Sequence, residues 1–200
     1  MFGPYFLCKL NDDIGRFLVA DKYRLPEEFF TTRFLVRRIV PTDAEAIFEG
    51  WNTDPEVTKY LTWKPHSELG QTQRAIEENY SAWNAGTSFP AVICHRERPH
   101  ELIGRIDARP MGHKVSYGWL VRRTWWGRGV ASEVVQLAVE HALSHPRIFR
   151  TEASCDVLNT ASARVMEKVG MTKEAVLRRY LFHPNFSNMP RDAFLYSKVR

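Results

Sequence analysis

The sequence predicts an α/β domain built on one mixed sheet. Three consecutive runs of alternating apolar residues are separated by turns of a few residues, which is typical of an antiparallel meander. Further along the chain, apolar residues at helical spacing alternate with strand-like runs, which is typical of β-α-β units. The chain has 200 residues, 44% hydrophobic and 26% charged, as expected for a single globular domain.

The first half of the domain is predicted to contain one strand followed by helices. Residues 33–40 alternate between apolar and polar side chains and form the strand. Thr42 and Glu45 have the spacing of a capping box, so a helix should start there. Asp54 precedes a proline and predicts a second, short helix. A longer amphipathic helix is expected over 67–83.

The second half is predicted to contain the meander and then two helices between strands. The expected strands and helices, in chain order, are strands Ser88–Cys94, Glu101–Ala108 and Val115–Val121, helix Gly129–Ser144, strand Ile148–Cys155, helix Thr160–Val169, and strands Glu174–Phe182 and Ala193–Lys198. The order places an antiparallel meander before a β-α-β unit, so the sheet should be mixed.

The first 30 residues are interpreted as an N-terminal extension. Two short β-prone runs, Tyr5–Leu10 and Arg16–Ala20, surround an Asn-Asp-Asp turn and are consistent with a hairpin. Leu25–Glu28 is then interpreted as a connector. The domain itself is therefore expected over residues 31–200.

The composition argues against several classes of protein. No apolar run approaches the roughly 20 residues needed to cross a bilayer, so no membrane partner is expected. The chain begins without the basic start of a secretory signal, and its three cysteines form no Cys-x-x-Cys pair, so a reducing cytoplasm is expected. The formal net charge is +5, but the basic residues are dispersed, which favours a solvated surface over a nucleic-acid site.

The most informative segment joins a strand to a helix through two glycines. After the strand that ends at Val121, Gly127 and Gly129 precede a helix that begins near Val130. Glycines can expose successive backbone N–H groups, and a helix N-terminus carries about half a positive charge, so a pyrophosphate can bind there. The spacing matches neither the NTPase phosphate loop nor the dinucleotide fingerprint. Taken alone, the two glycines also fit a simple helix-entry turn.

A second motif follows the next predicted strand. Asn159 has the position of an N-cap residue, and Ser162, Val165 and Met166 lie three and four residues apart along the helix that follows. This spacing places the Ser162 hydroxyl on the inward, apolar face of the helix rather than in water.

Together these two motifs resemble the GNAT N-acetyltransferases, and within them the RimJ/RimL-type branch. The resemblance lies in the Trp-Gly-Arg-Gly-Val-Ala loop at 126–131 and the Asn-x-x-Ser-x-x-Val-x-Glu-Lys-x-Gly-Met segment at 159–171, and it extends over residues 33–200. It implies a single N-acetyltransferase domain. It also implies a GNAT-like, mostly antiparallel sheet flanked by helices, with two central parallel strands splayed apart at a β-bulge.

The resemblance further implies acetyl-CoA as the co-substrate. Its pantetheine arm would bond the backbone of Leu120 and Val121 on one side and Asn159 on the other. Trp126 replaces the polar residue usual at the first place of the loop, so a side-chain contact is lost there while backbone donors remain. The loop expected to hold the pyrophosphate comprises Trp126, Gly127, Arg128, Gly129, Val130 and Ala131.

The same resemblance suggests how the reaction is catalysed. A backbone N–H near Leu120 or Val121 would stabilise the oxyanion. Many members donate a proton to the leaving thiolate from a tyrosine, but Met166 stands in that place. By similarity to this branch, Ser162 is the nearest replacement for the tyrosine as proton donor. The alternative is that Ser162 has only a structural role, with its hydroxyl bonding a backbone carbonyl of the helix.

Candidates for the acceptor side and for a general base are less specific. Trp63 and His66 lie between the first helices, which form a wall of the acceptor site in this family, although ordinary edge packing explains them too. Four residues beside predicted strands are candidate bases, each with an exposed or salt-bridged role as the alternative: Asp107, His113, Glu152 and Asp156. No histidines are spaced as metal ligands, so no metal is expected.

The sequence therefore predicts an enzyme that moves acetyl from acetyl-CoA to a primary amine by direct attack in a ternary complex. The favoured acceptor is a protein N-terminal amine. Two alternatives stay open, namely a small amine such as an amino acid, polyamine or antibiotic, and a non-catalytic acyl-CoA-binding module. The second alternative draws on the missing tyrosine. A homodimer is a further expectation.

Overall fold

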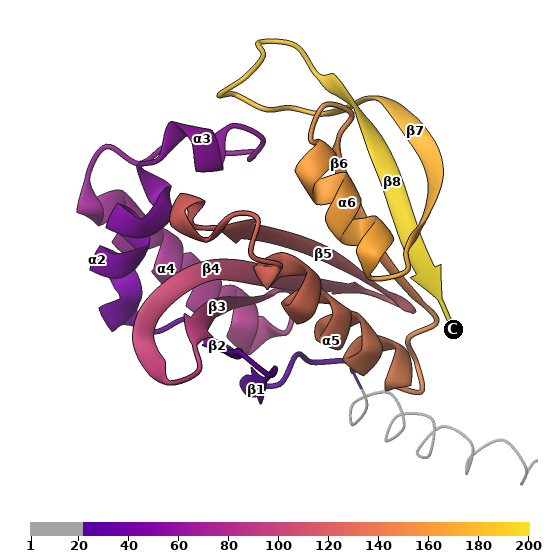
Figure 1. Cartoon of the computed structure of the whole chain (residues 1–200), viewed down its shortest axis with the longest axis horizontal. Coiled ribbons are helices and arrows are strands. Elements are labelled where there is room, and N and C mark those ends of the chain that lie inside the picture. The colour runs from indigo at the N-terminus through magenta and orange to yellow at the C-terminus, as the bar shows by residue number, and fades with distance from the viewer. Residues whose placement is uncertain (1–21) are drawn as a thin grey trace, which may run out of the picture.

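The computed structural model describes residues 22–200, so the hairpin expected within residues 5–20 lies outside it. These described residues form one eight-stranded sheet in the order β1-β2-β3-β4-β5-β6-β8-β7, which confirms the mixed, mostly antiparallel α/β class. Helices α5 and α6 cover one face of the sheet, and α2 and α4 lie against the other (Figure 1). The strands are β1 Glu28–Phe30, β2 Phe34–Arg38, β3 Phe89–His95, β4 Arg98–Met111, β5 Lys114–Val121, β6 Arg150–Asp156, β7 Thr172–Leu181 and β8 Arg191–Val199.

The helices agree closely with the expected amphipathic segments. The α-helices are α2 Ala44–Ile47, α3 Pro55–Thr58, α4 Leu69–Ala85, α5 Val130–Ser144 and α6 Thr160–Lys168. Short 3-10 turns lie at Pro41–Asp43 and Arg123–Trp125, and a π-helical turn at Phe48–Asn52 follows α2. Asp54 caps α3 as expected, because its carboxylate accepts a hydrogen bond from the Glu56 backbone N–H at 2.9 Å.

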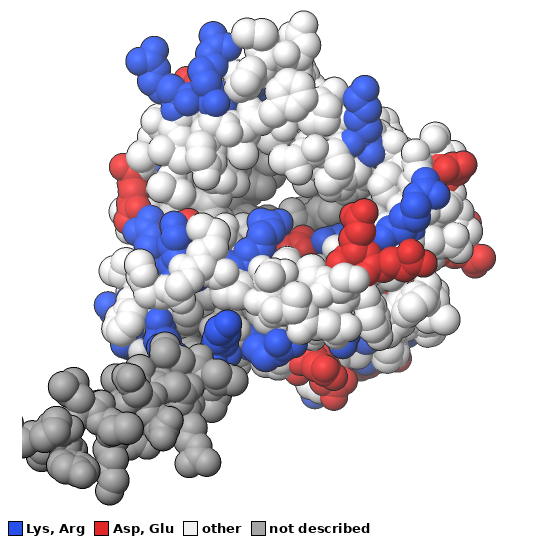
Figure 2. All heavy atoms as spheres, turned by 180° about the vertical axis from the view of Figure 1, so that it is seen from behind, with Lys and Arg blue, Asp and Glu red and all other residues white. Residues whose placement is uncertain are grey.

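The central parallel strands splay apart, as the resemblance implied. β5 and β6 pair only at their first residues, from Lys114 opposite Arg150 to Ser116 opposite Glu152. Beyond that point each strand stays paired with its outer neighbour, β5 with β4 and β6 with β8, so the two diverge towards their C-terminal ends. Seen from behind, the surface is hollowed near its middle, with acidic and basic side chains around the hollow (Figure 2).

The β-bulge expected in β5 is instead on the other side of β4. The register between β4 and β5 is continuous, whereas β3 and β4 shift register where Ile93 faces Gly104 and Cys94 faces Leu102. Ile103 is the extra residue. Its carbonyl accepts a hydrogen bond from the Arg122 N–H at 2.7 Å, just past the end of β5.

The helix start expected at Thr42 is wrong in its details. The residue that organises this turn is Asp43, which is buried and accepts two hydrogen bonds from Arg37 at 2.7 and 2.8 Å. The same carboxylate accepts from the Val40 backbone N–H at 2.9 Å. Arg37 belongs to the preceding strand, β2, so a local capping pattern around Thr42 could not reveal this arrangement.

The segment before residue 31 belongs in part to the domain. Tyr23 and Leu25 are buried in the main core beneath α5, and β1 pairs with β2. The Tyr23 hydroxyl lies 3.1 Å from the hydroxyl of Tyr117, which donates to the Ala138 carbonyl at 2.8 Å. Residues 22–30 are therefore packed into the fold rather than acting as a connector, and the domain starts before the expected boundary at residue 31.

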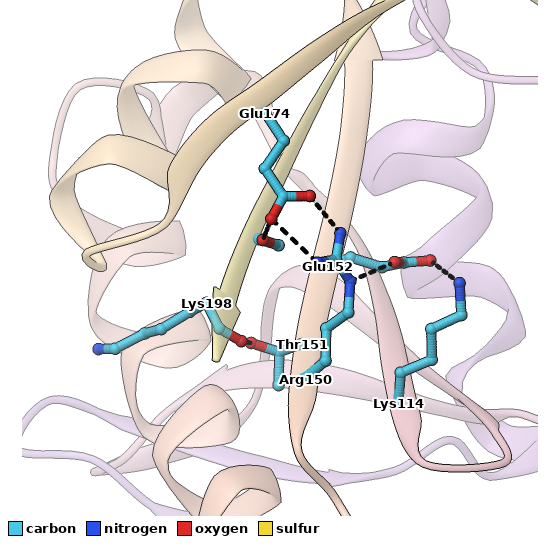
Figure 3. A network of polar contacts seen from close by, with 7 residues as sticks. Lys114, Arg150, Thr151, Glu152, Glu174 and Lys198 are labelled. Atoms are coloured by element: carbon cyan, nitrogen blue, oxygen red, sulfur yellow. Dashed lines mark hydrogen bonds and ion pairs between the residues drawn. The ribbon is translucent and has the colours of Figure 1, made fainter. Parts of the chain in front are cut away.

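The closed end of the splayed pair is tied together by a charged network. Lys114 of β5 and Arg150 of β6 both contact Glu152, at 2.8 and 2.9 Å (Figure 3). Arg150 also holds Glu174 of β7, which accepts a further hydrogen bond from Ser197. The network links four strands where they lie closest, so it stabilises the point from which β5 and β6 diverge.

This network predicts a loss of stability in acid. Hydrogen bonds from Arg150 and then Ser197 lower the pKa of Glu174 to about 2, so its stabilising effect is complete above the unfolded pKa of about 4.3 and is lost as the pH falls towards 2. We expect Glu174→Gln to lower the free energy of unfolding by less than about 1 kcal/mol near neutral pH, because the side chain is partly exposed. Urea unfolding between about pH 7 and pH 2 should show a shallower acid decline for the variant than for the wild type. Glu78→Gln, an exposed change on α4, should leave the decline unchanged, and equal declines in the wild type and the Glu174 variant would contradict the prediction.

Candidate active site

A cleft of about 790 Å³ occupies the opening between β5 and β6. Its walls come from segments far apart in the sequence: the α3 region, β4, β5, the loop into α5, the end of β6, the start of α6 and the end of β7. Most of the predicted site residues line it, namely Trp63, Leu120, Val121, Trp126, Gly127, Gly129, Val130, Ala131, Asn159 and Ser162. Arg128 and His66 do not.

The glycine loop brings the N-terminus of α5 to the cleft. Gly127 and Gly129 have φ values of 73° and 75°, a left-handed conformation that glycine adopts without strain. Gly129 immediately precedes α5, and within residues 22–200 no side chain caps this helix, so its first N–H groups remain available to an anion. Arg128 points away, with its guanidinium over the Trp125 ring at 5.1 Å.

Trp126 has a role that the sequence did not indicate. Its side chain is 48% exposed, and its indole N–H donates to the Val121 carbonyl at 2.7 Å. The contact joins the glycine loop to the last residue of β5. Trp126, for which the sequence predicted only the loss of a polar side-chain contact, therefore holds the glycine loop against β5.

Leu120 and Val121, the two residues predicted to contact the donor, differ in the direction of their backbone groups. Backbone groups of a strand point alternately to its two neighbours. Because the Arg122 N–H bonds Ile103 of β4, the backbone of Leu120, two residues earlier, also faces β4. The N–H groups of Trp119 and Val121 therefore face the opening towards β6. We accordingly assign the expected backbone role to Val121 rather than to Leu120.

Helix α6 forms the opposite wall of the cleft. Asn159 caps it as expected, because its side-chain oxygen accepts from the Ser162 backbone N–H at 3.2 Å. The Asn159 N–H donates to the Asp156 carbonyl at 2.8 Å, which fixes the turn between β6 and α6. Met166, which stands where the resemblance would place a tyrosine, is fully buried in the core and does not line the cleft.

On the acceptor side, Trp63 lines the cleft and His66 supports it from behind. His66 Nδ1 lies 2.7 Å from Thr72 Oγ1 and 3.1 Å from Asn52 Nδ2, and its ring centroid is 5.2 Å from that of Trp63. Burial, followed by the nearby charge of Arg74, lowers the pKa of His66. Of the two residues expected on the acceptor side, Trp63 therefore lines the cleft, whereas His66 packs against the Trp63 ring.

The four candidate bases are engaged in structural interactions or lie elsewhere. Asp107 is paired with Arg105 at 2.7 Å, and Glu152 is held by the network of Figure 3. Burial raises the pKa of Glu152, but hydrogen bonds from Lys114 and Arg150 outweigh it and lower the value. His113 is exposed in the turn between β4 and β5. Asp156 is buried and bonded to Arg191 at 2.5 and 3.1 Å.

Sequence reasoning missed the segment after β7 altogether. His183 is 2% exposed and lines the cleft, with its Nε2 3.8 Å from the carboxylate of Asp156. Two residues on, the Asn185 side-chain amide donates to the carbonyls of Thr58 and Trp63, at 2.8 and 2.7 Å. The loop after β7 is therefore tied to the α3 region across the top of the cleft. No spacing in the sequence could have paired these segments, since more than a hundred residues separate them.

The described part of the chain has neither a cluster of metal-binding side chains nor a membrane-spanning helix. No group of three His, Cys, Asp or Glu side chains in residues 22–200 is arranged to hold a metal ion. Among the helices of the same residues, none is both long and apolar enough to cross a membrane.

The open, mostly antiparallel sheet, the cleft between two splayed strands and the uncapped helix N-terminus agree with what the resemblance to the N-acetyltransferases implied. Residues 33–172 match the Acetyltransferase (GNAT) domain, and the chain belongs to this family. It is 31% identical over 173 residues to the uncharacterized N-acetyltransferase YoaA of Bacillus subtilis, a match that covers 85% of this chain and 95% of YoaA.

Solved structures share the same fold. A GNAT-family acetyltransferase from Bacillus anthracis is 26% identical and superposes with a TM-score of 0.73, covering 86% of this chain and 98% of that one. RimL, a ribosomal L7/L12 alpha-N-protein acetyltransferase solved with coenzyme A, has a TM-score of 0.74 at 17% identity over 84% of this chain and 95% of RimL. The microcin C7 self-immunity acetyltransferase MccE, solved with acetyl-CoA and AMP, has a TM-score of 0.78 at 16% identity, covering 88% and 98% of the two chains.

Proposed function

We propose that this acetyltransferase moves the acetyl group of acetyl-CoA to a primary amine, with the α-amine of a protein N-terminus as the favoured acceptor. The observation that carries the proposal is the cleft between β5 and β6, which has the uncapped N-terminus of α5 on one wall and the start of α6 on the other. The RimL structure with coenzyme A and the MccE structure with acetyl-CoA support this donor.

The residues present fit acetyl-CoA in charge and in hydrogen bonding. The first N–H groups of α5, after Gly127 and Gly129, would hold the pyrophosphate. Arg164 and Lys168 of α6 add positive charge to the cleft lining. Val121 would bond the pantetheine arm from one side through its backbone and Asn159 from the other through its side chain. The thioester would then lie where β5 and β6 diverge.

In this arrangement the amine attacks the thioester carbonyl directly. An α-amine has a pKa of about 7.7 to 8.0 and is partly neutral near physiological pH, whereas a lysine side chain at about 10.4 is not. The N–H of Val121 or Trp119 would stabilise the oxyanion of the tetrahedral intermediate. The Ser162 hydroxyl, which lines the cleft, would give its proton to the departing thiolate.

The acceptor side supports a slender substrate. Asn185 closes the top of the cleft by bonding Thr58 and Trp63, and the rings of Tyr60 and Phe186 lie 5.3 Å apart in the same closure. An extended chain end can enter beneath such a closure. The RimL name, which refers to an alpha-N-protein acetyltransferase, agrees with this acceptor, whereas the MccE name favours a small-molecule amine as the second candidate.

The test is release of the coenzyme A thiol, followed with a thiol-reactive dye, from acetyl-CoA and a panel of amines. Peptides that begin with Ser or Ala should turn over, and the same peptides with a blocked N-terminus and an internal lysine should not. Preference for amino acids, polyamines or aminoglycosides would shift the assignment to the small-amine candidate. Acetyl-CoA binding without turnover of any amine would indicate a non-catalytic acyl-CoA-binding module.

A further inference from the structure

His183 is a buried imidazole whose hydrogen-bonding needs are not met by the fold. The side chain is 2% exposed, and neither ring nitrogen has a hydrogen-bond partner among the described residues. A buried polar nitrogen without a partner is destabilising, so such groups are rare and call for an explanation. Because His183 lines the cleft, its partner has to come from what enters the cleft.

The surroundings of His183 hold the ring beside a fixed negative charge. Its Nε2 lies 3.8 Å from Asp156 Oδ2, and the Tyr60 ring stands edge-on to it at a centroid distance of 6.1 Å. Asp156 accepts hydrogen bonds from Arg191 and, at 2.8 Å, from the Leu158 N–H. Burial raises the pKa of Asp156, but these bonds and the Arg191 charge outweigh burial and lower it, so the carboxylate is ionised.

Asp156 also connects the two sides of the cleft. Its carboxylate faces His183 on the acceptor side, and its carbonyl accepts from the N–H of Asn159, which caps α6 on the donor side. The imidazole is thereby fixed next to the turn that would hold the donor. A base near the reacting carbon has to be placed within hydrogen-bond reach of the attacking nitrogen, and this turn sets that distance.

We propose that His183 is the catalytic residue that takes the proton of the attacking amine, with Asp156 and Arg191 as positioning residues. This inference rests on the proposed function. The amine nitrogen forms a bond to the thioester carbonyl carbon while its proton passes to a ring nitrogen of His183. The carbon–sulfur bond then breaks, and the coenzyme A thiolate takes a proton either from solvent or from Ser162, which regains one from solvent. The imidazolium returns its proton to solvent. Asp156 stabilises the imidazolium while it exists.

The test is a His183→Ala variant assayed with acetyl-CoA and peptides that begin with Ser or Ala. General-base catalysis contributes about 100-fold or more, so we expect kcat to fall by at least about 100-fold. The dissociation constant for acetyl-CoA should stay within about twofold, since His183 faces the acceptor side. Added imidazole, which can enter the space left by the side chain, should restore a measurable part of kcat. His100→Ala, an exposed histidine at the start of β4, is the matched control and should behave as the wild type with and without imidazole.

The results separate this inference from the proposed function. Wild-type kcat in His183→Ala, or a loss that imidazole does not restore in a folded variant that still binds acetyl-CoA, would overturn the role of His183 and leave the proposed function standing. A wild type that turns over no amine would remove both. If the variant does not fold, histidine-labelled wild type provides the test by NMR. The acceptor peptide should then shift the ring nitrogens of His183 while leaving those of His100 unchanged, and unshifted nitrogens would overturn the assignment.

Discussion

Acetyl-CoA should bind the purified protein with a micromolar dissociation constant, and Gly129→Glu should weaken that binding by at least about 100-fold, or about 2.7 kcal/mol. Gly129 has a φ of 75° and immediately precedes α5, where the donor pyrophosphate is expected. A glutamate there places a negative charge at the site of an anion and also a side chain in a conformation that side chains rarely adopt. Isothermal titration of both proteins measures the effect.

Gly129→Asn separates charge from backbone strain in this prediction. Asparagine tolerates the left-handed conformation better than other residues and carries no charge, so this variant should bind acetyl-CoA more tightly than Gly129→Glu. A thermal melt of each variant reports whether α5 stays folded. Tight binding of acetyl-CoA to a folded Gly129→Glu protein would show that the donor does not use the N-terminus of α5.

Gly104→Ala should destabilise the domain by about 1 to 3 kcal/mol and disturb the donor side of the cleft as well. Gly104 lies in β4 opposite Val121, and a methyl group there would sit 2.4 Å from the Leu120 carbonyl oxygen and 3.1 Å from the Val121 Cα. Both contacts are with backbone atoms of β5, so β4 and β5 have to move apart. The displaced segment of β5 is the one we expect to bond the pantetheine arm.

Chemical denaturation and acetyl-CoA titration together measure this effect. Gly70→Ala in the first turn of α4 is the control, because its added methyl would meet only the ends of flexible side chains, the nearest at 3.5 Å, and alanine favours a helix. We expect that variant to be as stable as the wild type or slightly more so. Equal stabilities of Gly104→Ala and the wild type would mean that β4 and β5 are less rigid than their close approach indicates.

The packing of the core bears on the tyrosine that is absent at position 166. Met166 is buried without contact to solvent, so a larger polar side chain at that position would have to displace part of the packing around α6. In the reaction that we propose, the proton for the thiolate then comes from Ser162, which lines the cleft, or from solvent. Donor-side and acceptor-side protons are thus assigned to different residues, Ser162 and His183, in the reaction that we propose.

Local patterns were sufficient to predict most elements, the two-glycine entry to α5 and the cap of α6. The period of apolar residues located the strands and the longer helices within a few residues, since it depends only on which face of each element is buried. The glycines at 127 and 129 and the cap at Asn159 were recognised for the same reason, because backbone conformation and capping act over a few residues.

The rest of the candidate site depends on contacts between residues that are distant in sequence. His66 and Arg128 are close in sequence to residues that line the cleft but do not line it themselves. From beyond β7, His183 lines the cleft and Asn185 bonds the α3 region. The divergence of β5 and β6 places Asp156 between the proposed donor and acceptor sides of the cleft, and Arg191 of β8 lowers the pKa of its carboxyl group. Local periodicity determines which face of an element is buried. The partner that each buried group meets is set by long-range packing, and that packing places the acceptor side of this enzyme.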